Sequence, residues 1–214
     1  MTKMKIAVVD YGMGNLRSVS KALEHVAPEC HVLVTSDPEH IAKSDRVVFP
    51  GQGAMPDCMR ELDLRGLRQV VMEATQQKPF LGICIGLQML FERSEEGNAA
   101  GLGVFKGHVK RFAAADMRDA QGQKLKVPHM GWSQVEQTIP HALWQGISNH
   151  ERFYYVHSYY VCPVDERMVA GTTCYPNPFT CAIAKDNLFA VQFHPEKSAQ
   201  AGLQLLRNFV HWQP

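Results

Sequence analysis

The chain has 214 residues and a mass of 24.0 kDa, enough for one compact domain with a full hydrophobic core. Its 22 basic and 21 acidic residues give a formal charge of +1, so no excess of positive charge indicates a nucleic acid or an anionic membrane as partner. No apolar run is long enough to cross a bilayer. We therefore expect a single domain over residues 1–214 whose partners are small molecules or proteins.

The first half alternates short β-branched runs with segments of helical periodicity, the pattern of βα units around a parallel sheet. Residues 6–9 form the first predicted strand, and apolar residues then recur at helical spacing from Leu16 until Pro28 ends the helix. Further strands are predicted at 32–34, 47–49 and 80–83, with helical segments near 55–62 and 67–74.

After about Val104 the pattern changes to short strand-like pieces between Gly, Pro and Asn turns, which suggests hairpins. The predicted pieces are 106–112, 124–127, 134–136, 153–156, 169–173, 180–184 and 188–193, followed by a last helix over 199–212. The sequence thus predicts a three-layer, flavodoxin-like α/β fold with a mostly parallel sheet and an antiparallel extension.

The cysteines and histidines show no metal-ligand spacing. Six cysteines lack a CxxC pair, and ten histidines lack an HxxxH or HExxH pattern. A core of this size needs no disulfides, so we expect reduced thiols in the cytoplasm. Because metal-ligand spacing is missing, we also expect no metal, and we expect no cofactor.

Cys84 lies in the most informative stretch, residues 78–88, which reads as strand, tight turn and helix. Gly82 and Gly86 flank it at a distance of two residues, as in a nucleophile elbow, where bulkier side chains would clash. A helix N-terminus favours the thiolate, the form that attacks carbon. The alternative for Cys84 is a buried structural thiol.

His194 ends an alternating strand and is followed by Pro195 and Glu196. Catalytic groups of α/β folds usually collect at such strand ends, and Pro195 fixes its own φ, so the turn holds the imidazole and the carboxylate in a defined relation. A carboxylate on one ring nitrogen supports the imidazolium that forms when the other nitrogen takes a thiol proton. The alternative for His194 alone is a capped strand end, but with Cys84 the chain offers nucleophile, base and orienting group.

These motifs resemble the signature of the class I glutamine amidotransferases, a G-x-C-x-G-x-Q elbow (Gly82 to Gln88) followed late in the chain by H-P-E (His194 to Glu196). Within that family the chain resembles the glutaminases that work with a (β/α)8-barrel cyclase in histidine biosynthesis. The matching segments run nearly from end to end and are residues 10–16, 50–54, 128–132 and 155–159.

The resemblance implies residue roles. Cys84, His194 and Glu196 would be catalytic, and the backbone of Ile85, Gly51 and Gln52 would form the oxyanion hole. Glutamine would be bound by Gly53, Gln88, Glu96, His157, Ser158 and Tyr159. The cyclase would be contacted, or the site gated, by Asp10, Tyr11, Asn15, His129, Met130, Trp132, Tyr154 and Lys197.

The resemblance also implies a heterodimer in which the cyclase receives ammonia through a channel, and we expect the Gly51–Gln52 peptide to flip when the cyclase docks. Two positions depart from the family pattern, because Gln52 replaces a common valine and Ser133 a common asparagine. The oxyanion contact uses main chain, so Gln52 need not remove a donor.

Weaker signals have simpler interpretations. The Gly12-x-Gly14 turn lacks the third glycine of a dinucleotide loop, since Arg17 stands there. The basic cluster at 106–111 is typical of a solvated strand edge, and the aromatic residues at 153–155 and 159–160 of strand packing. Two other functions stay open at this point: a cysteine hydrolase acting on peptides or reactive carbonyls, and a non-catalytic binding module.

Overall fold

The computed structural model describes residues 3–113, 117–119 and 121–214. Its first half contains β1 (Lys5–Val9), α1 (Leu16–Val26), β2 (His31–Thr35), α2 (Pro38–Ala42), β3 (Arg46–Phe49), α3 (Met55–Leu64), α4 (Arg68–Gln77), β4 (Phe80–Ile83), α5 (Ile85–Met89) and β5 (Phe91–Ser94). The second half contains η1 (Glu96–Asn98), β6 (Phe105–Arg111), β7 (His129–Gln134), β8 (Glu136–Gln137), η2 (Ala142–Trp144), β9 (Arg152–His157), β10 (Tyr159–Pro163), η3 (Glu166–Met168), β11 (Val169–Cys174), β12 (Pro178–Lys185), β13 (Leu188–Val191), η4 (Pro195–Lys197) and α6 (Ala199–His211).

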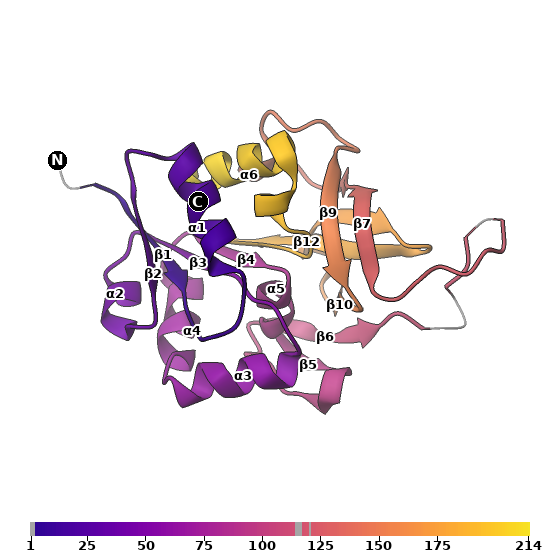
Figure 1. Cartoon of the computed structure of the whole chain (residues 1–214), viewed down its shortest axis with the longest axis horizontal. Helices are drawn as coiled ribbons and strands as arrows, with labels where there is room; N and C mark the ends of the chain where they lie inside the picture. Colours follow the sequence, from indigo (N-terminus) through magenta and orange to yellow (C-terminus); the bar gives the residue numbers. More distant parts are fainter. Residues whose placement is uncertain (1–2, 114–116, 120) are drawn as a thin grey trace.

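The main sheet has the strand order β2-β1-β3-β4-β13-β12-β10-β6-β5. Its β2-β1-β3-β4-β13 portion is parallel, and β12, β10 and β6 extend it in antiparallel fashion. Helices α1 and α6 cover one face of the parallel part, and α2, α3 and α4 cover the other (Figure 1). The predicted three-layer α/β fold with an antiparallel extension is therefore confirmed.

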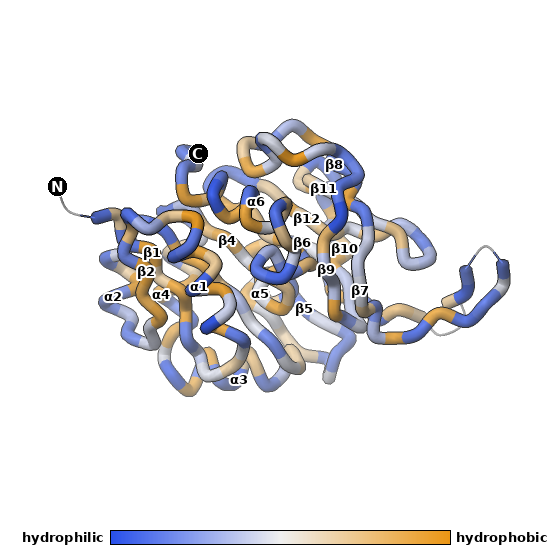
Figure 2. The backbone as a smooth tube through the Cα atoms, turned by 45° about the horizontal axis from the view of Figure 1, so that its top comes forward, coloured by the Kyte–Doolittle hydropathy of each residue, from blue (hydrophilic) through white to orange (hydrophobic). Residues whose placement is uncertain are grey.

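Burial explains why the central strands form. Every residue of β3, β4 and β13 is buried, which gives the continuous apolar runs that a sheet covered on both faces requires. In Figure 2 the backbone near β1 and β4 has hydrophobic colours, whereas many loops on the outside of the molecule are hydrophilic. The two faces of the sheet pack separate apolar clusters, one around Leu23 and Phe209 and one around Leu62 and Val71.

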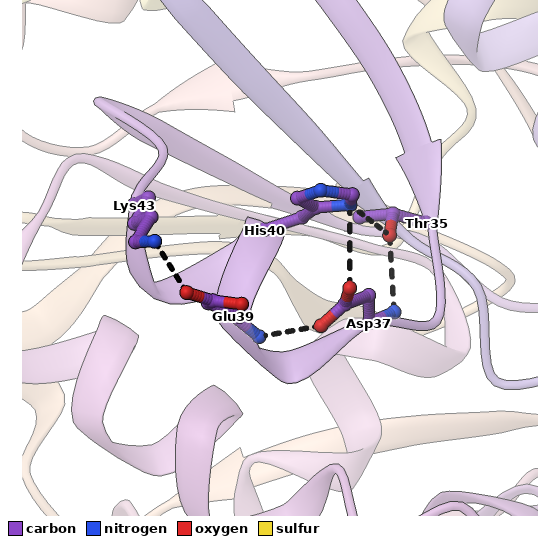
Figure 3. Close-up of polar contacts among 5 residues, drawn as sticks. All are labelled: Thr35, Asp37, Glu39, His40 and Lys43. Atoms are coloured by element: carbon purple, nitrogen blue, oxygen red, sulfur yellow. Dashed lines mark hydrogen bonds and ion pairs between the residues drawn. The ribbon is translucent and has the colours of Figure 1, made fainter.

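Helix α2 was not predicted, because five residues are too few to show helical periodicity. Its signal is local capping (Figure 3): the Asp37 carboxylate accepts a hydrogen bond from Glu39 N at 2.8 Å, and Thr35 Oγ1 accepts one from Asp37 N at 3.0 Å. Lys43 closes the helix by pairing with Glu39 one turn earlier.

The second half departs from the prediction at two predicted strands. Residues 124–127 form no strand, and Lys124 makes only an isolated bridge with Arg118. The predicted strand at 134–136 is divided at Val135, where the chain changes sheets: β7 pairs with β9 in a separate two-stranded sheet, whereas β8 pairs with β11. Strands β5 and β10 were not predicted, and of β7 only the last residue, Gln134, was.

Candidate active site

Two parallel strands bring the key motifs to one edge of the sheet. Strands β4 and β13 are neighbours with Ile83 opposite Val191, and Cys84 N donates to Val191 O at 2.8 Å. Cys84 and His194 therefore follow the carboxyl ends of adjacent strands, where ligands of α/β sheets bind.

Cys84 occupies a strained turn between β4 and α5. Its φ of 55° and ψ of −109° lie outside the regions that ordinary L-residues prefer. The flanking glycines are needed for space, because a Cβ at Gly86 would lie 1.9 Å from Phe49 O, and one at Gly82 would lie 3.0 Å from the Ala190 Cβ. The geometry is that of the predicted elbow.

His194 is held from several sides. Its Nδ1 lies 2.9 Å from Glu196 Oε1, and both side chains are almost entirely buried. Ser198 Oγ donates to His194 O at 2.6 Å, which fixes the backbone of the same turn. Pro195 begins the short η4 turn, so the spacing of the His-Pro-Glu segment produces the contact that the sequence predicts.

The electrostatics of this pair favour a charged imidazole. Burial alone would lower the pKa of His194, but the charge of the Cys84 sulfur, followed by Glu196, raises it to about 10. The second ring nitrogen, Nε2, is buried and has no hydrogen-bond partner among the described residues, so it is free to take a proton. His194 can therefore hold a proton taken from the Cys84 thiol.

A cavity of about 240 Å³ opens beside Cys84. It is smaller than the roughly 300–1,000 Å³ typical of sites for drug-sized ligands, which suits a single amino acid. The predicted glutamine-binding residues all line it, together with Gln52, Ile85 and His194: they are Gly53, Gln88, Glu96, His157, Ser158 and Tyr159. A larger hollow of about 1060 Å³ lies near Met117 and Tyr175, but none of the three predicted catalytic residues lines it.

The polar groups in the cavity are mainly acceptors on one side. Gln88 Nε2 donates to Tyr159 O at 3.1 Å and to Gln192 Oε1 at 3.0 Å, so both of its amide hydrogens are used and only Oε1 is left for a ligand. Glu96 Oε2 accepts a hydrogen bond from Met55 N at 2.8 Å, which leaves Oε1. These free oxygens suit an ammonium group.

Gln192 is a site residue that the sequence reasoning missed. Its side chain is fully buried, and Nε2 lies 3.7 Å from Cys84 Sγ. The available signal was its spacing, because residues two apart in an extended segment point to the same side, and Gln192 is two residues before His194.

A pair of buried histidines supports the cavity wall. His157 Nδ1 donates to Tyr159 O at 2.7 Å, so its Nε2 accepts from His129 Nδ1 at 3.0 Å, and His129 Nε2 in turn accepts from Ser133 Oγ at 2.9 Å. Burial lowers the pKa of His157 to about 3 and that of His129 to about 4, so both rings are neutral. Ser133 thus completes a hydrogen-bond chain.

The residues predicted to contact the cyclase or gate the site differ in exposure. Met130 and Trp132 are 62% and 44% exposed, Asn15 is also exposed, and Asp10, Tyr154 and Lys197 are half-buried. Tyr11 and His129 are buried, and their role in contacting the cyclase or gating the site stays a prediction.

Packing explains both exceptions. The ring of Tyr11 packs on Phe49 and its hydroxyl lies where a Cβ of Gly51 would be, whereas His129 stacks on Tyr155 and Tyr175. Tyr11 therefore contacts the predicted oxyanion segment from inside the protein.

The family profile described as "Glutamine amidotransferase class-I" matches residues 7–212 of this chain. The chain belongs to the class I glutamine amidotransferases. It is 67% identical to "Imidazole glycerol phosphate synthase subunit HisH" of Nitrosospira multiformis, over 98% of each chain, and 66% identical to the subunit of the same name from Dechloromonas aromatica, over 98% of this chain and 97% of that one.

Solved structures of distant sequence share the fold. PurLQS from Thermotoga maritima has a TM-score of 0.70 at 16% identity, covering 98% of this chain and 99% of that one. A glutamine amidotransferase from the same organism has a TM-score of 0.63 at 16% identity, covering 94% and 80%. The three-layer α/β fold is therefore shared by proteins of widely different sequence.

Proposed function

We propose that this chain is the glutaminase subunit of an imidazole glycerol phosphate synthase. It hydrolyses L-glutamine to glutamate and ammonia and passes the ammonia to a cyclase subunit in a heterodimer. The observation that carries this proposal is that Cys84 and His194 line one small cavity, with Glu196 bonded to His194, in a chain 67% identical to a subunit of that name.

The chemistry follows from the positions of these groups. His194 accepts the thiol proton, and Cys84 Sγ attacks the carboxamide carbon while the C=O π electrons move to oxygen. Backbone N–H groups of Ile85 and of the Gly51–Gln52 segment stabilise that oxyanion. When the oxyanion collapses, the C–N bond breaks and His194 returns the proton to the departing ammonia. Water then hydrolyses the thioester with His194 as base, which restores Cys84 and releases glutamate.

The amino-acid end of glutamine lies on the acceptor side of the cavity. Its α-ammonium binds the free Oε1 atoms of Gln88 and Glu96, and backbone N–H groups near Ser158 and Tyr159 bind the α-carboxylate. Both Gln88 and the turn that carries Cys84 are parts of one element, so a ligand anchored at Gln88 is in register with the sulfur.

Ammonia needs a protected route to its acceptor. In water at neutral pH it is quickly protonated, and ammonium is not nucleophilic, so a closed interface with the (β/α)8-barrel cyclase preserves the reactive form. The cyclase joins it to a phosphorylated ribulosyl aminoimidazole carboxamide and forms imidazole glycerol phosphate and an aminoimidazole carboxamide ribotide. The exposed Met130 and Trp132 on β7 offer an apolar docking patch for that partner.

The cellular setting agrees with this role. All six cysteines are free thiols, which supports the reducing, cytoplasmic location that the sequence predicts. In the part of the chain that the structure describes, no helix is both long and apolar enough to span a membrane.

The decisive experiment mixes the purified chain with its cyclase and follows glutamate production with and without the cyclase's nucleotide ligand. We expect glutamine turnover to depend on the cyclase and rise with its ligand, and Cys84→Ser complexes to be inactive. Equal activity of wild-type and Cys84→Ser complexes contradicts the assignment of the nucleophile. Turnover by the lone chain equal to that of the liganded complex contradicts gating by the partner.

A further inference from the structure

Gln192 lies directly beside the sulfur of Cys84. It follows β13 as Cys84 follows the neighbouring parallel strand β4, and its backbone N–H is fixed by a 2.8 Å hydrogen bond to Cys181 O. The side chain is 0% exposed, so its carboxamide must find partners within the protein.

The orientation of the Gln192 carboxamide is determined by its neighbours. Tyr159 O can only accept a hydrogen bond, so the amide nitrogen of Gln88 must point toward it. The same nitrogen donates to Gln192 Oε1 at 3.0 Å. Gln192 therefore presents its oxygen to Gln88 and its N–H2 group to Cys84 Sγ, 3.7 Å away.

We propose that Gln192 stabilises the thiolate of Cys84 by donating an N–H···S hydrogen bond, and that Gln88 sets the orientation of this donor. The inference rests on the proposed role of Cys84 as nucleophile. In a buried site, the hydrogen bond from this neutral donor is stronger when the sulfur is negatively charged than when the sulfur is a thiol or a thioester. Gln192 thus favours the form of the enzyme that attacks glutamine.

This role differs from that of His194. His194 takes the proton and so must change its charge during the reaction, whereas Gln192 keeps its protons throughout. Gln192 also links the sulfur to the glutamine-binding cavity, because Gln88 lines that cavity and holds the Gln192 oxygen.

The test is the rate at which iodoacetamide alkylates Cys84 in the full chain as a function of pH, with the modified peptide identified by mass spectrometry. Gln192→Met removes the donor at similar side-chain length, and Gln200→Met on the exposed surface of α6 is the matched control. Loss of a hydrogen bond to the ionised sulfur lowers the fraction of thiolate at neutral pH about tenfold. Because the thiolate is the form that reacts, the rate of alkylation of Gln192→Met at neutral pH falls by the same factor.

The shape of the profile separates this role from mere packing. In Gln192→Met the half-maximal rate moves to higher pH by about 1 pH unit, while the rate at high pH equals that of the wild type. A profile identical to that of the wild type, or a rate lowered equally at every pH, overturns the inference. Alkylation of a cysteine other than Cys84 instead overturns the proposed function.

A measurement on the natural sequence covers the case in which Gln192→Met does not fold. In a 15N-labelled protein, the side-chain amide resonances of Gln192 shift as Cys84 ionises, and they do not shift over the same pH range in Cys84→Ser. Equal behaviour of the two proteins overturns the inference.

Discussion

His141 begins the η2 turn by accepting a hydrogen bond on Nδ1 from Leu143 N at 3.1 Å, and its ring packs on Phe189 and Trp212. A protonated Nδ1 cannot accept this bond. Burial lowers the pKa of His141 to about 4. The unfolded chain therefore binds a proton at this histidine near pH 6.5, whereas the folded chain binds it only near pH 4. The stability this neutral ring contributes is present above pH 6.5 and is lost as pH falls toward the folded pKa.

The size of the loss follows from linkage. Between pH 7.5 and pH 5.0, a histidine whose pKa falls from 6.5 to about 4 on folding removes about 2 kcal/mol from the free energy of unfolding. For a chain of this size that is roughly a 4–8 °C change in Tm. Other groups titrate as well, so the prediction concerns the difference between the wild type and a variant that cannot titrate at this position.

The variant is His141→Asn, which keeps a side-chain cap, and the exposed His31→Asn is the control. Urea unfolding at both pH values, followed by tryptophan fluorescence, gives the free energies. We expect the wild type and His31→Asn to lose about 2 kcal/mol more than His141→Asn on acidification. An equal loss in all three proteins refutes the reasoning.

Three further substitutions test other parts of the structure. Gly86→Ala places a Cβ against Phe49 O, so the elbow must distort. We expect the free energy of unfolding in urea to fall by at least about 1–3 kcal/mol and the complex to lose glutaminase activity, whereas an active, stable variant contradicts the need for glycine. Trp144→Phe removes the 3.1 Å hydrogen bond from Nε1 to Ala170 O, but that carbonyl keeps its 3.2 Å hydrogen bond from Thr138 N. We therefore expect the hydrogen bond itself to contribute only about 0.5–1.5 kcal/mol to the free energy of unfolding measured in urea, and wild-type stability would show that it contributes nothing. Glu196→Gln removes a charge that raises the pKa of His194. By NMR of labelled histidine, we expect the imidazolium to lose its proton at lower pH than in the wild type, and we expect glutamine turnover to fall at least about tenfold. An unchanged titration argues against the charge effect.

The sequence predicts the parallel half of the fold well, because β3, β4 and β13 are buried on both faces and leave unbroken apolar runs. It also predicts the contact of His194 with Glu196, which depends on neighbours in the chain. Gln192 was missed because its partner Gln88 is 104 residues away, and the division at Val135 was missed because strand partners are not encoded in local periodicity. The resemblance assigns Tyr11 and His129 to contact with the cyclase or to gating, but it does not predict that aromatic packing buries them.

Strand β7 has two faces with different tasks. Met130 and Trp132 project outward, while His129 and Ser133, on the opposite side, are bonded to each other and through His157 to the Tyr159 carbonyl. The outward-facing side chains of β7 are thus joined to the cavity wall by hydrogen bonds between two neutral, buried rings. The hydrogen-bond chain that starts on β7 therefore ends at the Tyr159 carbonyl of β10, and the same carbonyl accepts the hydrogen bond from the Gln88 amide in the glutamine-binding cavity.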